Sequence, residues 1–494
     1  MSDVCLVLEG TYPFVSGGVS SCVYQLIRAT PQINYFILYL GAYPHGQEEY
    51  KYPIPSNVQL IKIITLFDLK VDAQTTRLGI DFDWSLIEQF HLAVNKVEFQ
   101  GLEEIWRALF FPESRLCDPF ELFSSQEVWD LLDTIYRRQK RDYSFIDYFY
   151  TWRFAHYPLF KVLSTKIPRA DIYHALSTGY AGMLASVAKV KYGAPMALTE
   201  HGIYTHERQI DISLADWIYN TDIAIEAKKN SSFFKQWWMK LFNFMGQYCY
   251  HQADIITTLY GGNRDKQISL GAKRNKIRLI PNGVDFPRLS ALKSVNKLER
   301  KEGEVIVALV GRVVPIKDIK SFIKAISIVF NSASNFRVLI CGPTDEDEEY
   351  FNDCQSLVSI LELSSCISFP GKVNLNEYYP DIDLMVLSSI SEGQPMVILE
   401  GFCLAIPCVA TNVGSCHELI YGNNAEDRAL GAAGEVVPFG KPDLLAAAMI
   451  KLINNSELRR QCGEVGRKRV QRFYQENTNI DNYLELYQDL ELGI

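Results

Sequence analysis

Two glutamates enclose an apolar stretch in the second half of the chain, Glu392 and Glu400 of EGQPMVILE. Spacing alone says little, because about seven carboxylate pairs at this separation arise by chance in a chain with 58 Asp and Glu among 494 residues. Pro395 suits the first turn of a helix, so Glu392 should precede the helix and Glu400 should lie within it. The free N–H groups at the helix start would bind a phosphate. The stretch favours a sugar–diphosphate–nucleoside ligand, with one carboxylate for the sugar and one for the ribose.

Two cations follow another expected strand. The run VIVALV, residues 305–310, leads into Gly311 and Arg312, and Lys317 comes five residues later. Open α/β sheets bind ligands at the carboxyl ends of their strands. An Arg can form paired hydrogen bonds with diphosphate oxygens, while a Lys acts as a point charge. The two residues predict a diphosphate site; a solvated basic turn is the alternative for this motif on its own.

A pair of glycines follows the first expected strand. The run VCLVLEG continues into TYPFVSGGVSS, so Gly17 and Gly18 fall where a loop should become a helix near Ser20. Glycines at this place allow close approach of a ligand to the backbone, and the helix start supplies N–H groups for a phosphate. The alternative is a tight turn between strand and helix, because the G-x-G-x-x-G pattern is incomplete.

Three acidic clusters have the appearance of metal motifs: DFD at 81–83, DED at 345–347 and DID at 381–383. The first two are expected in solvated loops and the third opens a buried strand, so we expect no metal and no other cofactor. Glu392 could also be a covalent nucleophile, as in retaining hydrolases that use two carboxylates. This role is disfavoured, because Glu400 is assigned to the ribose and no second acid is evident.

Short apolar runs, each followed by a loop and a helical pattern, must position these residues. Such alternation predicts α/β sheets covered on both faces. The expected strands are 4–8, 35–40, 172–175, 196–199 and 254–258 in the first half, and 305–310, 336–340, 366–369, 383–387 and 407–410 in the second. Residues 60–165 are rich in aromatic and charged residues and predict inserted helices.

The composition is that of a soluble globular protein, and a length of 494 residues suggests two domains or three. The net charge of −9 is not that of a protein that coats nucleic acid. The 11 cysteines include no C-x-x-C pair, which favours reduced thiols. The start of the chain resembles no secretory signal and no run of 18 apolar residues occurs, so a cytoplasmic location is expected.

The motifs GRVVPIK, SEGQPMVILE and PNGVD, with the N-terminal glycine loop, together resemble the retaining glycosyltransferases of family four, the glycogen-synthase-like group. The segments LEGTYPFVSGGVSS and TEHGIYTHERQ and the insertion resemble more closely the PelF family of cytoplasmic glycosyltransferases of bacterial Pel exopolysaccharide synthesis. This resemblance implies the GT-B fold: two Rossmann-like domains facing across a cleft, with a helical insertion in the first. The expected divisions are 1–285 for the acceptor-side domain, 286–304 for a linker, 305–475 for the nucleotide-sugar domain, and 476–494 for a C-terminal helix packing back on the first domain.

The resemblance implies a role for each matching residue. Arg312 and Lys317 would bind the diphosphate and balance its charge as it leaves. Glu392 would hold hydroxyls of the donor sugar, and Glu400 would hold the ribose. His201, in the loop after MALTE, would lie near the transferred sugar. Further contacts with the donor are implied for Gly17, Gly18, Gly393, Gln394, Pro395, Met396 and Val397.

The activity implied is metal-independent transfer, with retention, from a UDP-sugar, UDP-glucose in the first instance, to a growing exopolysaccharide. The implied partners are the UDP-sugar donor, the polysaccharide acceptor and membrane proteins of a polysaccharide synthase complex that would hold the protein at the inner membrane; no nucleic acid is expected. A nucleotide-sugar 2-epimerase on the same fold and a non-catalytic nucleotide-sugar-binding subunit are the alternatives.

One aromatic segment, SSFFKQWWMKLFNFMGQYCY at 231–250, places its largest side chains on one helical face. A core helix of the first domain is the favoured interpretation. A docking surface for a membrane partner is the alternative.

Overall fold

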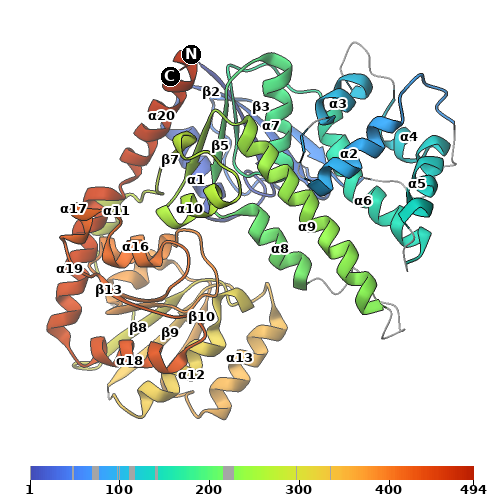
Figure 1. Cartoon of the computed structure of the whole chain (residues 1–494). Helices are drawn as coiled ribbons and strands as arrows, with labels where there is room; N and C mark the ends of the chain where they lie inside the picture. Colours follow the sequence, from blue (N-terminus) through green and yellow to red (C-terminus); the bar gives the residue numbers. More distant parts are fainter. Residues whose placement is uncertain are drawn as a thin grey trace. The chain divides into compact units, whose positions relative to one another are not determined.

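The computed structural model describes residues 2–46, 49–68, 77–96, 98–99, 101–110, 117–139, 143–214, 227–295, 297–333 and 335–493. The chain forms two compact units. Unit 1 comprises Met1–Thr258, Arg264–Arg278 and Leu484–Ile494, and unit 2 comprises Leu259–Asn263 and Leu279–Tyr483. Figure 1 shows that each unit is built around a sheet with helices packed against it.

Unit 1 contains a parallel sheet in the order β3-β2-β1-β4-β5-β6-β7. The strands are β1 (Asp3–Glu9), β2 (Asn34–Gly41), β3 (Val58–Thr65), β4 (Ile172–Ala175), β5 (Met196–Glu200), β6 (Ile255–Thr258) and β7 (Ile277–Leu279). The strand order reverses between β1 and β4, and ligands of such sheets bind at this switch point. The strands β3 and β7 were not predicted from the sequence, because they are short or half-exposed edge strands without a continuous apolar run. The prediction that the helical insertion begins at residue 60 is therefore wrong by several residues.

The helices of unit 1 form two groups. The first group follows the strands of the sheet: α1 (Gly18–Ala29), α7 (Gly179–Tyr192), α8 (Tyr204–Leu214), α9 (Ala227–Gln252) and α10 (Gly261–Ser269), whose first residues group with unit 2. The inserted group comprises α2 (Ser85–Lys96), α3 (Leu102–Phe110), α4 (Pro119–Phe123), α5 (Gln126–Gln139) and α6 (Phe145–Ser164), which gather at one side of the unit in Figure 1.

The aromatic helix α9 belongs to the core of unit 1. Phe234, Trp237, Leu241 and Met245 are all buried, and they contact the inserted helices in one continuous hydrophobic cluster. The ring of Trp237 stacks on His156 of α6 at a centroid distance of 5.0 Å. The prediction of a core helix is confirmed, and the buried face is not a docking surface.

Unit 2 repeats the order of the first six strands of unit 1, with its sheet in the order β10-β9-β8-β11-β12-β13. The strands are β8 (Val305–Val310), β9 (Phe336–Cys341), β10 (Ile367–Gly371), β11 (Leu384–Leu387), β12 (Cys408–Thr411) and β13 (Gly434–Val437). Alternate residues of β8 enter two different clusters: Val307 packs with α12 (Ile319–Phe330) and α18 (Pro442–Ile453), and Ala308 packs with α15 (Met396–Cys403). Both faces of the sheet are therefore covered, as continuous apolar strands require.

Unit 2 contains further helices among the described residues. They are α11 (Phe286–Ser290), α13 (Glu348–Ile360), α14 (Leu375–Tyr378), α16 (Cys416–Tyr421), α17 (Ala425–Arg428), α19 (Ser456–Phe473) and α20 (Glu476–Leu492). The last part of α20 groups with unit 1. There, the hydroxyl of Tyr487 lies 2.8 Å from Nδ1 of His174 on β4, and Arg278 pairs with Asp489 at 2.6 Å.

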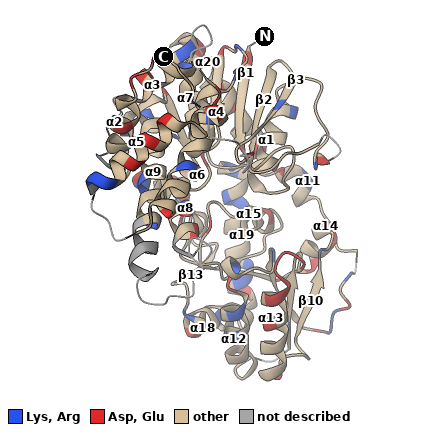
Figure 2. Ribbon diagram, turned by 90° about the vertical axis from the view of Figure 1, so that its right-hand side faces the viewer, with Lys and Arg blue, Asp and Glu red and all other residues tan. Residues whose placement is uncertain are grey.

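Positively and negatively charged residues are interspersed along the helices and loops, as the coloured ribbon of Figure 2 shows. Most ion pairs among the described residues lie at the surface, where each contributes little to stability. A buried exception joins Arg469 of α19 to Asp427 of α17 at 2.5 Å. No helix in the described ranges is long and apolar enough to cross a membrane.

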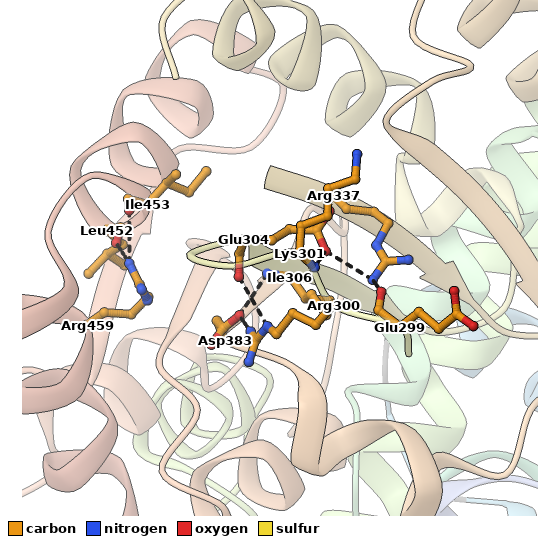
Figure 3. A network of polar contacts seen from close by, with 10 residues as sticks. All are labelled: Glu299, Arg300, Lys301, Glu304, Ile306, Arg337, Asp383, Leu452, Ile453 and Arg459. Atoms are coloured by element: carbon orange, nitrogen blue, oxygen red, sulfur yellow. Dashed lines mark hydrogen bonds and ion pairs between the residues drawn. The ribbon is translucent and has the colours of Figure 1, made fainter. Parts of the chain in front are cut away.

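The segment expected as a linker is attached to unit 2 at both ends. Val284 forms a parallel β-bridge with Gln475, which explains why residues from 279 onward group with unit 2. At the other end, Arg300 pairs with Asp383, and Arg337 Nη2 donates to the carbonyl of Glu299 at 2.8 Å (Figure 3). The contacts of Arg300 and Arg337 lie at the amino ends of the strands, the edge opposite the predicted site.

Candidate functional site

The loops after β8 and β11 are neighbours, because these two strands pair at the switch point of the sheet in unit 2. The backbone N–H of Ile390 donates to the carbonyl of Ile316 at 2.8 Å. The hydroxyl of Ser388 donates to the carbonyl of Lys317 at 2.7 Å. The first loop therefore has a fixed position relative to the second, which carries Glu392.

Lys317 and Glu392 form an ion pair in these loops. The ammonium Nζ of Lys317 lies 2.5 Å from Oε1 of Glu392, and the hydroxyl of Ser389 donates to the same oxygen at 2.6 Å. The two charged side chains are 20% and 13% exposed, so their attraction is screened less than that of a surface pair. The sequence placed both residues at this edge, but it did not predict that they pair with each other.

Arg312 occupies the more open side of the same loop. Its Nη1 lies 2.7 Å from Oε2 of Glu346, and the side chain is 55% exposed. An exposed pair of this kind is weak, so an anion that binds at this edge can replace Glu346 at low cost.

The segment 393–397 turns from the β11 loop into α15. Pro395 is the N-cap and the helix begins at Met396, so Glu392 precedes the helix and Glu400 lies within it, as the sequence predicted. The carbonyl of Gly393 accepts from the N–H of Ser415 at 2.9 Å. Gly414 has φ +54°, and a Cβ at this position would lie 2.3 Å from the carbonyl oxygen of Gly393, so the close approach requires glycine.

The side chain of Gln394 is occupied within the protein. Its Oε1 accepts from the N–H of Asn282 at 2.7 Å, and both residues are buried. A contact of Gln394 with a donor would therefore come from its backbone or from Nε2, since Oε1 is already engaged. Asn282 lies in PNGVD and fixes the position of this turn.

Glu400 lies in the body of α15 and has one buried partner. The hydroxyl of Tyr379 donates to its Oε2 at 2.5 Å. Burial raises the pKa of Glu400, while the hydrogen bond from Tyr379 lowers it. Tyr379 was missed in the sequence, since nothing local to YYPDID indicates a contact with a residue 21 positions away.

In unit 1, Gly17 and Gly18 lie exposed at the start of α1, at the carboxyl end of β1. The helix begins at Gly18, two residues before the predicted start. The N–H of Gly17 donates to the hydroxyl of Tyr52 at 3.4 Å. A Cβ on either glycine would meet nothing within 4 Å, so packing within the protein does not require glycine here.

His201 follows β5 directly, also at the carboxyl edge of its sheet. It is half-buried, and burial lowers the pKa of its imidazole to about 4. The ring is therefore neutral at physiological pH, which suits a hydrogen-bonding role better than a role as a charge. Its neighbour Glu200 is almost fully buried, and burial raises the pKa of this carboxyl group.

The acidic clusters noted in the sequence have structural partners. Asp347 caps α13 by accepting from the N–H of Tyr350 at 2.9 Å, and Asp83 accepts from the N–H of Ser85 at 3.0 Å. Asp383 accepts from the N–H of Ile306 at 2.8 Å. Within the described part of the chain, no group of three or more His, Cys, Asp and Glu side chains could hold a metal ion.

Two family models match the chain in succession. The model described as "Domain of unknown function (DUF3492)" matches residues 2–275, and the model "Glycosyl transferases group 1" matches residues 291–469. The first match alone covers more than half of the chain. The chain belongs to the DUF3492 family and carries a group 1 glycosyltransferase domain. The boundary between the two matches falls close to the boundary between the two units.

Curated relatives agree with this assignment. The chain is 27% identical over 216 residues to the capsular polysaccharide biosynthesis glycosyltransferase CapM of Staphylococcus aureus, which is 40% of this chain and 52% of CapM. It is 22% identical over 311 residues to the N-acetyl-alpha-D-glucosaminyl L-malate synthase of Bacillus anthracis, which is 62% of this chain and 74% of that protein. The chain thus spans about half the length of CapM.

Solved structures share the fold over the whole chain. Sucrose-phosphate synthase from Thermosynechococcus elongatus aligns with a TM-score of 0.61 and 15% identity, covering 100% of both chains. HepE of Anabaena in complex with UDP aligns with a TM-score of 0.60 and 13% identity, covering 99% of this chain and 100% of HepE. The prediction of two Rossmann-like domains of the GT-B type is confirmed.

Proposed function

We propose that the protein is a retaining glycosyltransferase that transfers a sugar from a UDP-sugar, with UDP-glucose as the expected donor, to a growing bacterial exopolysaccharide of the Pel type. The observation that carries the proposal is the ion pair of Lys317 and Glu392 in the loops before α15, at the switch point of one sheet, with Arg312 on the same loop as Lys317 and Glu400 in the body of α15. The family membership and the resemblance to PelF in the first unit support the same conclusion.

In the proposed reaction, the bond between C1 of the donor sugar and the diphosphate oxygen breaks, and a bond from C1 to an acceptor hydroxyl oxygen forms on the same face. The proton of the acceptor passes to the leaving diphosphate, and UDP is released. Arg312 and Lys317 would stabilise the negative charge that develops on the leaving group. The diphosphate would replace Glu392 and Glu346 as the partner of these cations.

The two carboxylates would then have different tasks. Glu392, released from Lys317 on one oxygen, would accept hydrogen bonds from hydroxyls of the donor sugar. Glu400 would bind the ribose hydroxyls with the oxygen that Tyr379 does not occupy. Because two cations neutralise the diphosphate, we propose that the reaction needs no metal ion.

Gly17, Gly18 and His201 remain predictions for contacts with the donor, made on the resemblance. The acceptor would be a polysaccharide, and membrane proteins of a polysaccharide synthase complex would bring the protein to the inner membrane. These partners are proposed on the resemblance to PelF and on the polysaccharide-related names of relatives such as CapM.

Calorimetric titration with UDP, GDP and ADP, followed by their glucose and N-acetylhexosamine conjugates, tests the proposal. We expect UDP to bind most tightly, and Lys317→Ala to weaken binding. Lys320→Ala is a matched control, because this lysine lies on α12 and pairs with Asp353 of α13. Product analysis then separates the alternatives: an epimerase would change the donor sugar without an acceptor, and a non-catalytic subunit would bind without turnover. Failure of all three nucleotides to bind would contradict the proposal.

A further inference from the structure

Two further carboxylates, the half-buried Glu9 and the buried Glu200, lie near the switch point of the sheet in unit 1. Glu9 ends β1, Glu200 ends β5, and α7 begins just after β4, which lies between these strands. Both side chains therefore reach the carboxyl edge of the sheet. Glu9 lies in the segment LEGTYPFVSGGVSS, but the resemblance implies no role for it.

Glu9 joins the start of α7 to the start of α8. Its Oε2 accepts from the N–H groups of Tyr180 and Ala181 at 3.1 and 3.4 Å, which satisfies the first turn of α7. Its Oε1 accepts from the hydroxyl of Tyr204 at 2.6 Å. Burial raises the pKa of the Glu9 carboxyl group, while these hydrogen bonds lower it.

Glu200 holds the other end of the same tyrosine. Its Oε1 accepts from the N–H of Tyr204 at 3.4 Å and from the hydroxyl of Thr178 at 3.2 Å. Its Oε2 accepts from the hydroxyl of Tyr250 at 2.5 Å and from Nε2 of Gln267 at 2.9 Å. Every oxygen of the two carboxylates thus accepts at least one hydrogen bond from the protein, which favours a positioning role over proton transfer.

The ring of Tyr204 fills a space that only a glycine leaves open. Gly179, the first residue of α7, has φ +27°, and a Cβ there would lie 2.4 Å from the Tyr204 ring. Such contacts do not occur, so any larger residue at 179 would displace the ring. We call Glu9, Gly179, Glu200 and Tyr204 the Tyr204 clamp.

We propose that the Tyr204 clamp positions His201 for sugar transfer, with Tyr204 as the central positioning residue. His201 lies in the short connection between Glu200 and Tyr204, and the clamp holds both ends of this connection. The backbone N–H of Tyr204 is fixed by the carboxylate of Glu200, and its hydroxyl is fixed by Glu9. The backbone that carries the imidazole is therefore held at the carboxyl edge. The inference rests on the proposed function, which places His201 near the transferred sugar.

The test replaces Tyr204 by Phe, which keeps the ring against Gly179 and removes only the hydroxyl. We expect the His201 ring resonance, measured at fixed pH by NMR of histidine-labelled protein and assigned with His201→Gln, to shift. We expect kcat for transfer to fall by about tenfold or more, since a displacement of about 1 Å at a reacting group can cost about a hundredfold. The KM for the donor should change by less than about twofold, because Arg312, Lys317 and Glu400, the residues proposed to bind the diphosphate and the ribose, lie in unit 2 and are unaltered.

Tyr157→Phe is the matched control. Its hydroxyl donates to Asp68 at 2.7 Å, so this variant also loses one bond from a tyrosine to a carboxylate in unit 1, but away from the clamp. We expect it to leave the His201 resonance and kcat unchanged. Gly179→Ala, which displaces the ring without removing a hydroxyl, should shift the resonance in the same way as Tyr204→Phe.

An unchanged His201 resonance in Tyr204→Phe and Gly179→Ala would overturn the inference, and so would an equal shift in Tyr157→Phe. The resonance needs no substrate, so it still tests the clamp if the wild-type protein transfers no sugar. In that case the proposed function fails and the structural role of the clamp is decided separately.

Discussion

The inserted helices of unit 1 should make the protein sensitive to acid. His91 of α2 is buried among aromatic rings, at a centroid distance of 5.3 Å from Trp237 and 5.9 Å from His156. Burial lowers the pKa of His91 from 6.5 to about 4. At a pH between these two pKa values, the His91 side chain binds a proton in the unfolded chain but not in the folded protein. The stability that neutral His91 contributes is therefore fully present above pH 6.5 and is lost as the pH falls.

The size of this effect follows from the difference in pKa. A shift from 6.5 to about 4 corresponds to a loss of about 2 kcal/mol at pH 5 and about 3 kcal/mol below pH 4 for His91 alone. Glu9 and Glu200 act in the opposite direction, because their raised pKa values make the folded protein bind protons more tightly than the unfolded chain. The total slope with pH therefore mixes both contributions, and a variant is needed to isolate His91.

Replacing His91 by Phe removes the titrating group and keeps an aromatic ring in the cluster. Urea unfolding at pH 7.5 and pH 5.0, followed by tryptophan fluorescence, measures the loss of stability between the two pH values. We expect this loss to be smaller in the variant by about 2 kcal/mol. His251→Phe, at an exposed position of α9, should show the wild-type loss. If His91→Phe loses as much stability as the wild type, the reasoning from burial is refuted.

The other predictions concern the proposed site and the core. Lys317→Ala should lower transfer at least about a hundredfold, measured as UDP release, because the leaving diphosphate loses a fixed cation; near-normal turnover would exclude the assignment. Glu400→Gln should weaken UDP binding in calorimetry, whereas Glu392→Gln should spare UDP and weaken the sugar conjugate, and an equal loss of UDP affinity in both would contradict the division of tasks. Transfer should survive exhaustive chelation with EDTA, and the product should keep the anomeric configuration of the donor sugar; loss of transfer in EDTA that Mn²⁺ restores would contradict metal independence. Trp237→Ala should destabilise unit 1 by about 3–5 kcal/mol in thermal or urea unfolding, since the ring is 4% exposed; an unchanged transition would contradict its place in the core.

The interior strands and the loops that follow them could be predicted from the sequence. Continuous apolar runs such as 305–310 form interior strands because both faces of the sheet are covered. Pro395 and the apolar residues after it predicted the start of α15, and the charges of Lys317 and Glu392 predicted a polar site at one edge. These features depend on local sequence, so a single segment is enough to indicate them.

Edge strands and the contacts between distant segments could not be predicted in this way. The strands β3, β7 and β13 are short, or are partly exposed, and so lack the apolar pattern that marks an interior strand. Hydrogen bonds and ion pairs at the two sites also join residues that are far apart in the sequence: Lys317 pairs with Glu392 75 positions away, and Tyr204 donates to Glu9 195 positions away. Parallel pairing of strands that are distant in sequence brings their carboxyl-end loops together, and only the order of the strands decides which loops meet. The sequence by itself therefore determined which residues could do chemistry and at which strand ends they stand, whereas the tertiary structure decided which of them touch.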